Sequence, residues 1–203
     1  MTYRLGKLLV GLVLFALGVT MTVQAELGLA PWDVLHSAIS GLTGLGFGTA
    51  SVLVSIAVLG LAMALGTRPG IGTVLNTLLI GVVIELLLRA GFLGAAADWG
   101  WPWRLLLLVG GLATIGLGSA LYIGAHLGSG PRDSLMVAVH TRFRTPIFAA
   151  RTITEGSAFL LGWLLGGAVG IGTVISVLLI GPLVQLGFAA TRQTPVRPHP
   201  GPV

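Results

Sequence analysis

The stretch Leu27-Gly28-Leu29-Ala30-Pro31-Trp32-Asp33-Val34-Leu35 returns one hundred residues later as Leu127-Gly128-Ser129-Gly130-Pro131-Arg132-Asp133-Ser134-Leu135. A second block keeps the same offset, because Gly70–Gly81 and Gly170–Gly181 are identical at nine of twelve positions. Two separated blocks in one register indicate a duplicated unit. Repeat one covers about residues 5–90, a linker covers about residues 91–104, and repeat two covers about residues 105–190.

The composition of this duplicated chain is that of a membrane protein. Hydrophobic residues make up 55% of the 203 residues and charged residues only 8%, with a mean hydropathy of +1.00. Soluble domains carry roughly 25% charged residues. The net charge of +5 does not indicate a nucleic-acid partner, because the basic residues stand singly beside apolar segments. We predict a single all-α membrane domain over residues 1–203, in contact with the lipid bilayer.

Six apolar runs are long enough to cross about 30 Å of hydrocarbon as helices. The predicted spans are Leu8–Ala25, Phe47–Gly66, Ile71–Leu88, Leu105–Ala125, Ile147–Leu165 and Ile171–Ala190. The first run has features of a secretory signal, but its glycine pattern recurs in the fourth run, so we expect it to be retained. Residues 191–203 carry four prolines and no hydrophobic period, which predicts a disordered tail.

Each repeat also contains a helix that is too short to span. Pro31 and Pro131 suit the first turn of a helix, where a missing N–H would have no partner in any case. The helix after Pro31 should end near Thr43, which gives about 13 residues and a length of about 20 Å. We therefore predict two short interfacial or re-entrant helices beside the six transmembrane helices. The structural residues of these motifs are Gly28, Pro31, Gly128, Gly130 and Pro131.

Three spans per repeat is an odd number, so repeat two must enter the membrane from the opposite side. The prediction is two three-span inverted repeats, which recur in secondary transporters. With the N-terminus inside, nine basic residues lie on the cytoplasmic side and two outside, which places both termini in the cytoplasm. An eight-span alternative satisfies the charge rule equally well. It would place Asp133 and Arg142 only about 13 Å apart on a helix that must cross about 30 Å, so we prefer six spans.

Asp33 and Asp133 occupy equivalent positions at the starts of the two short helices. One interpretation is structural, because an aspartate in the first helical turn accepts unpaired backbone N–H groups. The functional interpretation is a pair of acids, one near each membrane face, that gates or binds a cation or proton along a central path. His36 lies one turn after Asp33 and would join it as a proton-handling group. Arg132 stands beside Asp133 in the second copy only.

Glu155 is expected about 12 Å deep in the fifth span, where an unpaired carboxylate is costly. Arg151 stands one turn earlier on the same helix face and can neutralise it. The pair is either self-contained or part of a site. Its equivalent in copy one, Ser55, is uncharged, so a site here would be asymmetric. The chain has no cysteine and no readable arrangement of nucleophile and base or of metal ligands, so we expect no enzyme activity, metal or cofactor.

The motifs carry a family resemblance. Gly28–Asp33 and Leu127–Met136 resemble the G-x-G-P-W-D and G-x-G-P-R-D-x-L-M segments of the YczE/YyaS/YitT family of bacterial integral membrane proteins. Arg151, Glu155 and the Gly170–Thr173 block extend the resemblance over about residues 5–190. Copy one departs from the pattern at Ala30, where a glycine is usual. The resemblance implies a polytopic protein of the bacterial plasma membrane and supplies no mechanism.

Two functional hypotheses follow from this sequence. The leading hypothesis is a small secondary transporter or permease-like protein for an unidentified small solute or ion. Its candidate path residues are Asp33, His36, Arg132, Asp133, Arg151 and Glu155. The rival is a non-transporting membrane scaffold or regulatory partner protein, which predicts a tightly packed interior without a polar cavity. Neither hypothesis determines whether the chain forms a homo-oligomer.

Overall fold

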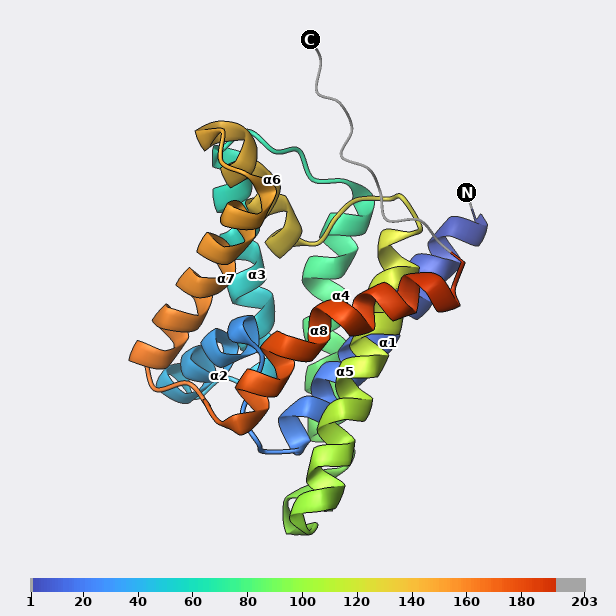
Figure 1. Cartoon of the computed structure of the whole chain (residues 1–203), viewed down its shortest axis with the longest axis vertical. Helices are drawn as coiled ribbons and strands as arrows, with labels where there is room; N and C mark the ends of the chain where they lie inside the picture. Colours follow the sequence, from blue (N-terminus) through green and yellow to red (C-terminus); the bar gives the residue numbers. More distant parts are fainter. Residues whose placement is uncertain (1, 193–203) are drawn as a thin grey trace.

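The computed structural model describes residues 2–192, and this part of the chain is helical throughout (Figure 1). The α-helices are α1 (Thr2–Gln24), α2 (Pro31–Thr43), α3 (Phe47–Ala64), α4 (Ile71–Arg89), α5 (Trp101–Ile123), α6 (Pro131–Phe143), α7 (Ile147–Leu164) and α8 (Ile171–Ala190). A short 3-10 helix, η1 (Gly94–Asp98), lies between α4 and α5. The tail that we predicted to be disordered lies, from residue 193 onward, outside the described residues.

Both short helices begin at the predicted prolines. α2 starts at Pro31 and ends before Gly44, which has a left-handed backbone conformation (φ 71°) that stops the helix. α6 starts at Pro131 and has the same length of 13 residues. The all-α class is therefore confirmed for the described residues. α5 begins at Trp101, earlier than the predicted Leu105, because Pro102 also fits the first turn of a helix.

Five helices are long and apolar enough to cross a membrane, namely α1, α3, α4, α5 and α8. The sixth expected span, α7, is 18 residues long but is less apolar because it carries Arg151 and Glu155. Large apolar side chains such as Leu86 and Leu178 are more than half exposed, as expected for a surface that faces lipid. These helices make the chain a membrane protein.

The first helices of the two repeats, α1 and α5, cross closely at four glycines. A Cβ atom on Gly18 would lie 2.6 Å from the carbonyl oxygen of Gly111, and one on Gly111 would lie 2.8 Å from that of Gly18. Gly11 and Gly118 oppose each other in the same reciprocal way. The early glycine of each helix therefore faces the late glycine of the other, so α1 and α5 run antiparallel.

The loops that begin at Leu27 and Leu127, and lead into α2 and α6, each bind the other repeat instead of their own. The carbonyl oxygen of Leu27 accepts a hydrogen bond of 2.6 Å from the N–H of Gly172, and that of Leu127 accepts one of 2.8 Å from Gly72. Each loop thereby satisfies an otherwise unpaired N–H at the start of the other repeat's last helix, α8 or α4. A Cβ on Gly72 would lie 2.9 Å from the Leu127 carbonyl, so the glycines of the second block allow this close contact.

The helices form two groups that meet at the centre of the molecule. α1 and α5 pack together, with α4 against α1 and α8 against α5. In the second group α2 packs on α7 and α3 packs on α6, so the short helix of each repeat contacts the other repeat. Figure 1 shows α2, α3, α6 and α7 together on the left and α1, α5 and α8 on the right. The short helices are thus held between parts of both repeats.

Candidate functional site

A cavity of about 190 Å³, with both apolar and polar side chains in its wall, lies where the two repeats meet. Its lining includes the first turns of α2 and α6 and residues of α1, α3, α4, α5, α7 and α8. The charged side chains that line it are Asp33, Arg132, Asp133, Arg151 and Glu155. Five of the six candidate path residues therefore lie around one cavity, and the sixth, His36, contacts Asp33.

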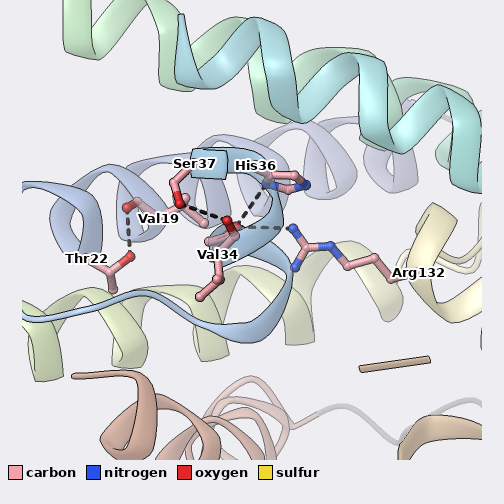
Figure 2. Close-up of polar contacts among 7 residues, drawn as sticks. Val19, Thr22, Val34, His36, Ser37 and Arg132 are labelled. Atoms are coloured by element: carbon pink, nitrogen blue, oxygen red, sulfur yellow. Dashed lines mark hydrogen bonds and ion pairs between the residues drawn. The ribbon is translucent and has the colours of Figure 1, made fainter. Parts of the chain in front are cut away.

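Asp33 is the most deeply buried of these charges, with 2% of its surface exposed. A guanidinium nitrogen of Arg132 donates a hydrogen bond of 3.3 Å to its Oδ1 atom, and His36 Nδ1 lies 3.2 Å from the same oxygen. Figure 2 shows Arg132 extending from α6 toward α2, where His36 lies. Within the described residues, the hydrogen-bond donor to Asp33 is the Arg132 side chain and not a backbone N–H group, which the helix-cap interpretation requires. Asp33 therefore forms an ion pair between the repeats.

This ion pair has no symmetric counterpart. The residue equivalent to Arg132 in repeat one is Trp32, and its ring centre lies 5.4 Å from the guanidinium carbon of Arg132. Trp32 and Asp33 thus hold the guanidinium from the same helix, by a cation–π contact and an ion pair. Since position 32 offers no positive charge, Asp133 receives no equivalent partner.

Asp133 instead accepts a hydrogen bond of 3.2 Å at Oδ2 from the Tyr122 hydroxyl of α5. The buried Tyr122 ring packs edge-to-face against Phe15, with ring centres 6.1 Å apart, and both rings line the cavity. We expected Asp33 and Asp133 near opposite membrane faces. The structure brings both to one cavity, because α2 and α6 both begin there.

The ion pair predicted on α7 is present. Arg151 Nε donates a hydrogen bond of 2.9 Å to Glu155 Oε1, and both residues line the cavity. Their side chains are 56% and 36% exposed, so they lie at a more open part of the cavity than Asp33. A similar pair on α4, Glu85 with Arg89 at 2.8 Å, lies outside the lining of this cavity.

Although it named Ser55 as the equivalent of Glu155, sequence reasoning did not assign the neutral polar side chains of the lining to the site. These are Ser51, Ser55, Asn76, Thr77, Ser119 and Tyr122. Asn76 is only 8% exposed, and its amide has no hydrogen-bond partner among residues 2–192. Two signals in the sequence point to these positions. Asn76 is the only asparagine of the chain and stands in an apolar span, and the hundred-residue offset equates Ser51 and Ser55 with Arg151 and Glu155.

Of the five structural residues of the motifs, Pro31, Gly130 and Pro131 line the cavity. Gly28 and Gly128 have φ values of 106° and 130°, which glycine adopts without strain. Gly130 precedes the first turn of α6, and a Cβ there would lie 3.2 Å from the amide atoms of Asn76.

Comparisons with known proteins agree with the membrane assignment. Residues 2–188 match DUF6198, described as a family of unknown function. An uncharacterized protein of Haemophilus influenzae is 36% identical, over 95% of this chain and 86% of the relative. Two Bacillus subtilis relatives, the uncharacterized membrane protein YczE and the uncharacterized protein YyaS, are 31% and 29% identical, over 91% and 87% of this chain and 89% and 88% of their own lengths. No solved structure matches. The YczE and YyaS relatives confirm the resemblance inferred from the motifs.

Proposed function

This chain belongs to the DUF6198 family, and from that premise we propose that it is a small secondary transporter or permease-like protein of the bacterial plasma membrane. It consists of two inverted three-span repeats, and its solute or ion binds in the cavity between them. The observation that carries the proposal is a polar cavity at which a short helix of each repeat begins. Helix N-termini that meet at a site between repeats are typical of secondary transporters.

Reciprocal contacts support the inverted arrangement. Gly11 opposes Gly118 and Gly18 opposes Gly111, so exchanging the two repeats leaves the contacts unchanged. This is the contact pattern of a local twofold axis. Because α1 and α5 are equivalent and antiparallel, the axis is perpendicular to them. An axis perpendicular to spanning helices lies in the membrane plane and relates two repeats of opposite orientation.

Six spans follow if α7 crosses the membrane in the way that its equivalent α3 does. The two helices have the same length of 18 residues. The charges on α7 are paired, and the pair of Arg151 with Glu155 faces the cavity, so it is compatible with a spanning helix. With the N-terminus inside, both termini are cytoplasmic, and nine of the eleven lysine and arginine residues lie on that side.

The polar cavity favours a transporter over the rival, a scaffold or regulatory partner. A scaffold has no need of a polar interior, and it predicts close packing of the helices throughout. Here five charged side chains and several neutral polar ones surround an open volume at the repeat interface. Oδ1 of Asp133 and the amide of Asn76 have no hydrogen-bond partner among the described residues, and a bound solute would supply one.

Cysteine labelling tests the inverted repeat, because the chain has no cysteine of its own. Gly41 and Thr141 are equivalent, exposed positions on α2 and α6. We expect Gly41→Cys to react with a membrane-impermeant thiol reagent in intact cells, and Thr141→Cys to react only in inside-out vesicles. Labelling of both positions from the same side would refute the inverted arrangement.

Ser55, which lines the cavity and is partly exposed, tests transport itself. If the cavity opens alternately to the two sides, Ser55→Cys reacts with the impermeant reagent from either side. Gly41→Cys and Thr141→Cys serve as controls, since each reacts from one side only. A scaffold leaves Ser55→Cys unreactive from both sides, and reaction from a single side would also contradict alternating access.

A further inference from the structure

The lining of the cavity carries one more negative charge than positive charges. Three carboxylates, those of Asp33, Asp133 and Glu155, line it together with the guanidinium groups of Arg132 and Arg151. The adjacent imidazole of His36 does not correct this imbalance. A charged imidazolium has two N–H donors, and within residues 2–192 neither ring nitrogen of His36 makes a hydrogen bond of acceptable geometry. The acceptor near His36 is Asp33 Oδ1, which lies 3.2 Å from Nδ1 and already accepts a hydrogen bond from Arg132. Nε2 has no partner within residues 2–192, so a second N–H would be buried without an acceptor, and we take His36 as neutral.

The excess charge is located on Asp133. Asp33 is paired with Arg132 at 3.3 Å, and Glu155 is paired with Arg151 at 2.9 Å. Asp133 has only the neutral hydroxyl of Tyr122, which binds Oδ2 and leaves Oδ1 free of partners among the described residues. Its position in the first turn of α6 favours the ionised carboxylate, because the helix dipole is positive there. Burial raises the pKa of Asp133, so a cation beside Oδ1 is needed to keep the carboxylate ionised.

Asn76 is an independent indication of a ligand at the same place. Its side chain lines the cavity, is 8% exposed, and has no hydrogen-bond partner in the described part of the chain. The amide lies against the start of α6, since a Cβ on Gly130 would be 3.2 Å from its atoms, and Gly130 is three residues before Asp133. A carbonyl oxygen and a carboxylate oxygen are the ligand types that hard cations prefer.

The size and composition of the cavity restrict the cation. A cavity of roughly 150 Å³ holds a molecule the size of benzene. The volume of about 190 Å³ therefore admits an alkali-metal ion with part of its water shell, or an ammonium ion with a few carbon atoms. The rings of Phe15 and Tyr122 in the wall suit an ammonium ion through cation–π contacts. Among residues 2–192 no three acidic or histidine side chains group together as metal ligands, which argues against a divalent metal.

We propose that the cavity binds one small monovalent cation, inorganic or ammonium, between the carboxylate of Asp133 and the amide of Asn76. The role of this cation, as transported substrate or as coupling ion, rests on the proposed transport function. Binding itself depends only on the cavity.

Thermal unfolding of the purified full-length protein in lipid nanodiscs measures this binding. Chloride salts of sodium, potassium and methylammonium are titrated against N-methylglucamine chloride at constant ionic strength. We expect a saturable rise in the unfolding midpoint with at least one of the three cations, and the comparison among them identifies which. Asp133→Asn should raise the half-saturating concentration at least about tenfold, and Asn76→Ala should raise it several-fold. Glu85→Gln, the same chemical change outside the cavity, should leave the concentration unchanged.

The absence of a saturable rise with all three cations would overturn the proposal, as would an unchanged response in Asp133→Asn. If Asp133→Asn does not fold, Asn76→Ala and Tyr122→Phe decide. Tyr122→Phe retains the carboxylate and must still bind, whereas Asn76→Ala must bind more weakly. Uptake of the bound cation into proteoliposomes separates the two proposals. If the cation binds but neither uptake nor alternating access is seen, transport is refuted and the cation site stands. If alternating access is seen without any effect of the cations, the cation site is refuted and transport stands.

Discussion

Alanine at Gly18 would place a methyl carbon 2.6 Å from the carbonyl oxygen of Gly111 and 2.8 Å from the backbone nitrogen of Ile115. Ordinary contacts begin at 3.4 Å, so α1 and α5 must move apart by about 0.8 Å at their crossing. Neither neighbour can rotate away, because both are backbone atoms. Overpacking of this kind costs about 1–3 kcal/mol, and the better helix propensity of alanine offsets about 1 kcal/mol. We expect Gly18→Ala to lower the free energy of unfolding by up to about 2 kcal/mol.

Gly6 is the matched control, because it lies on the same helix and a Cβ there meets nothing within 4 Å. Gly6→Ala should be neutral or stabilising by up to about 1 kcal/mol. Titration of mixed micelles with dodecyl sulfate, followed by tryptophan fluorescence, measures both variants. Because the contact is reciprocal, Gly111→Ala should lose about as much stability as Gly18→Ala. Stability of Gly18→Ala equal to that of Gly6→Ala would refute the close crossing, and a loss in only one of the two reciprocal variants would refute the twofold contact.

Arg132→Gln should lower the free energy of unfolding by about 3–5 kcal/mol, because it leaves the carboxylate of Asp33 buried without its charged partner. Adding Asp33→Asn should restore at least about 1 kcal/mol of this loss; strictly additive losses in the same dodecyl sulfate titration would show that the two groups do not interact. Gly130→Ala should cost about 1 kcal/mol through its contact with the Asn76 amide. Asn76→Ser, which introduces the residue found at the equivalent position 176, should restore the unfolding midpoint of Gly130→Ala, and failure to do so would mean that the amide is not the obstacle.

The helices of this protein could be predicted from local signals. Pro31 and Pro131 mark the starts of two helices because proline both fits and favours a first turn, and Gly44 ends α2 because it accepts the left-handed conformation. The hundred-residue offset then required each element to occur twice. Charged pairs one turn apart, such as Arg151 with Glu155, were also predictable, since both partners lie on one helix.

The partners of Asp33 and Asp133 could not be predicted in this way. An aspartate in a first helical turn has backbone donors nearby, and local reasoning assigns it to them. The structure instead pairs Asp33 with a guanidinium of the other repeat, which depends on how the two repeats are exchanged. Periodicity within one segment carries no information about that exchange. Asn76 was missed for the same reason, because its significance depends on the N-terminus of α6, which comes from the other repeat.

The loop exchange affects the order in which the protein can be made. Leu27 accepts its hydrogen bond from Gly172, which is synthesised 145 residues later. Gly72 donates its hydrogen bond to Leu127, which is synthesised 55 residues after Gly72. When repeat one leaves the ribosome, the starts of its own last helix and of its short helix therefore lack their final neighbours. Each repeat alone lacks the loop that completes the start of its last helix, and the other repeat supplies that loop. Two separate chains, divided in the linker before Trp101 and inserted in the opposite orientations that we propose for the repeats, should therefore assemble into the same molecule.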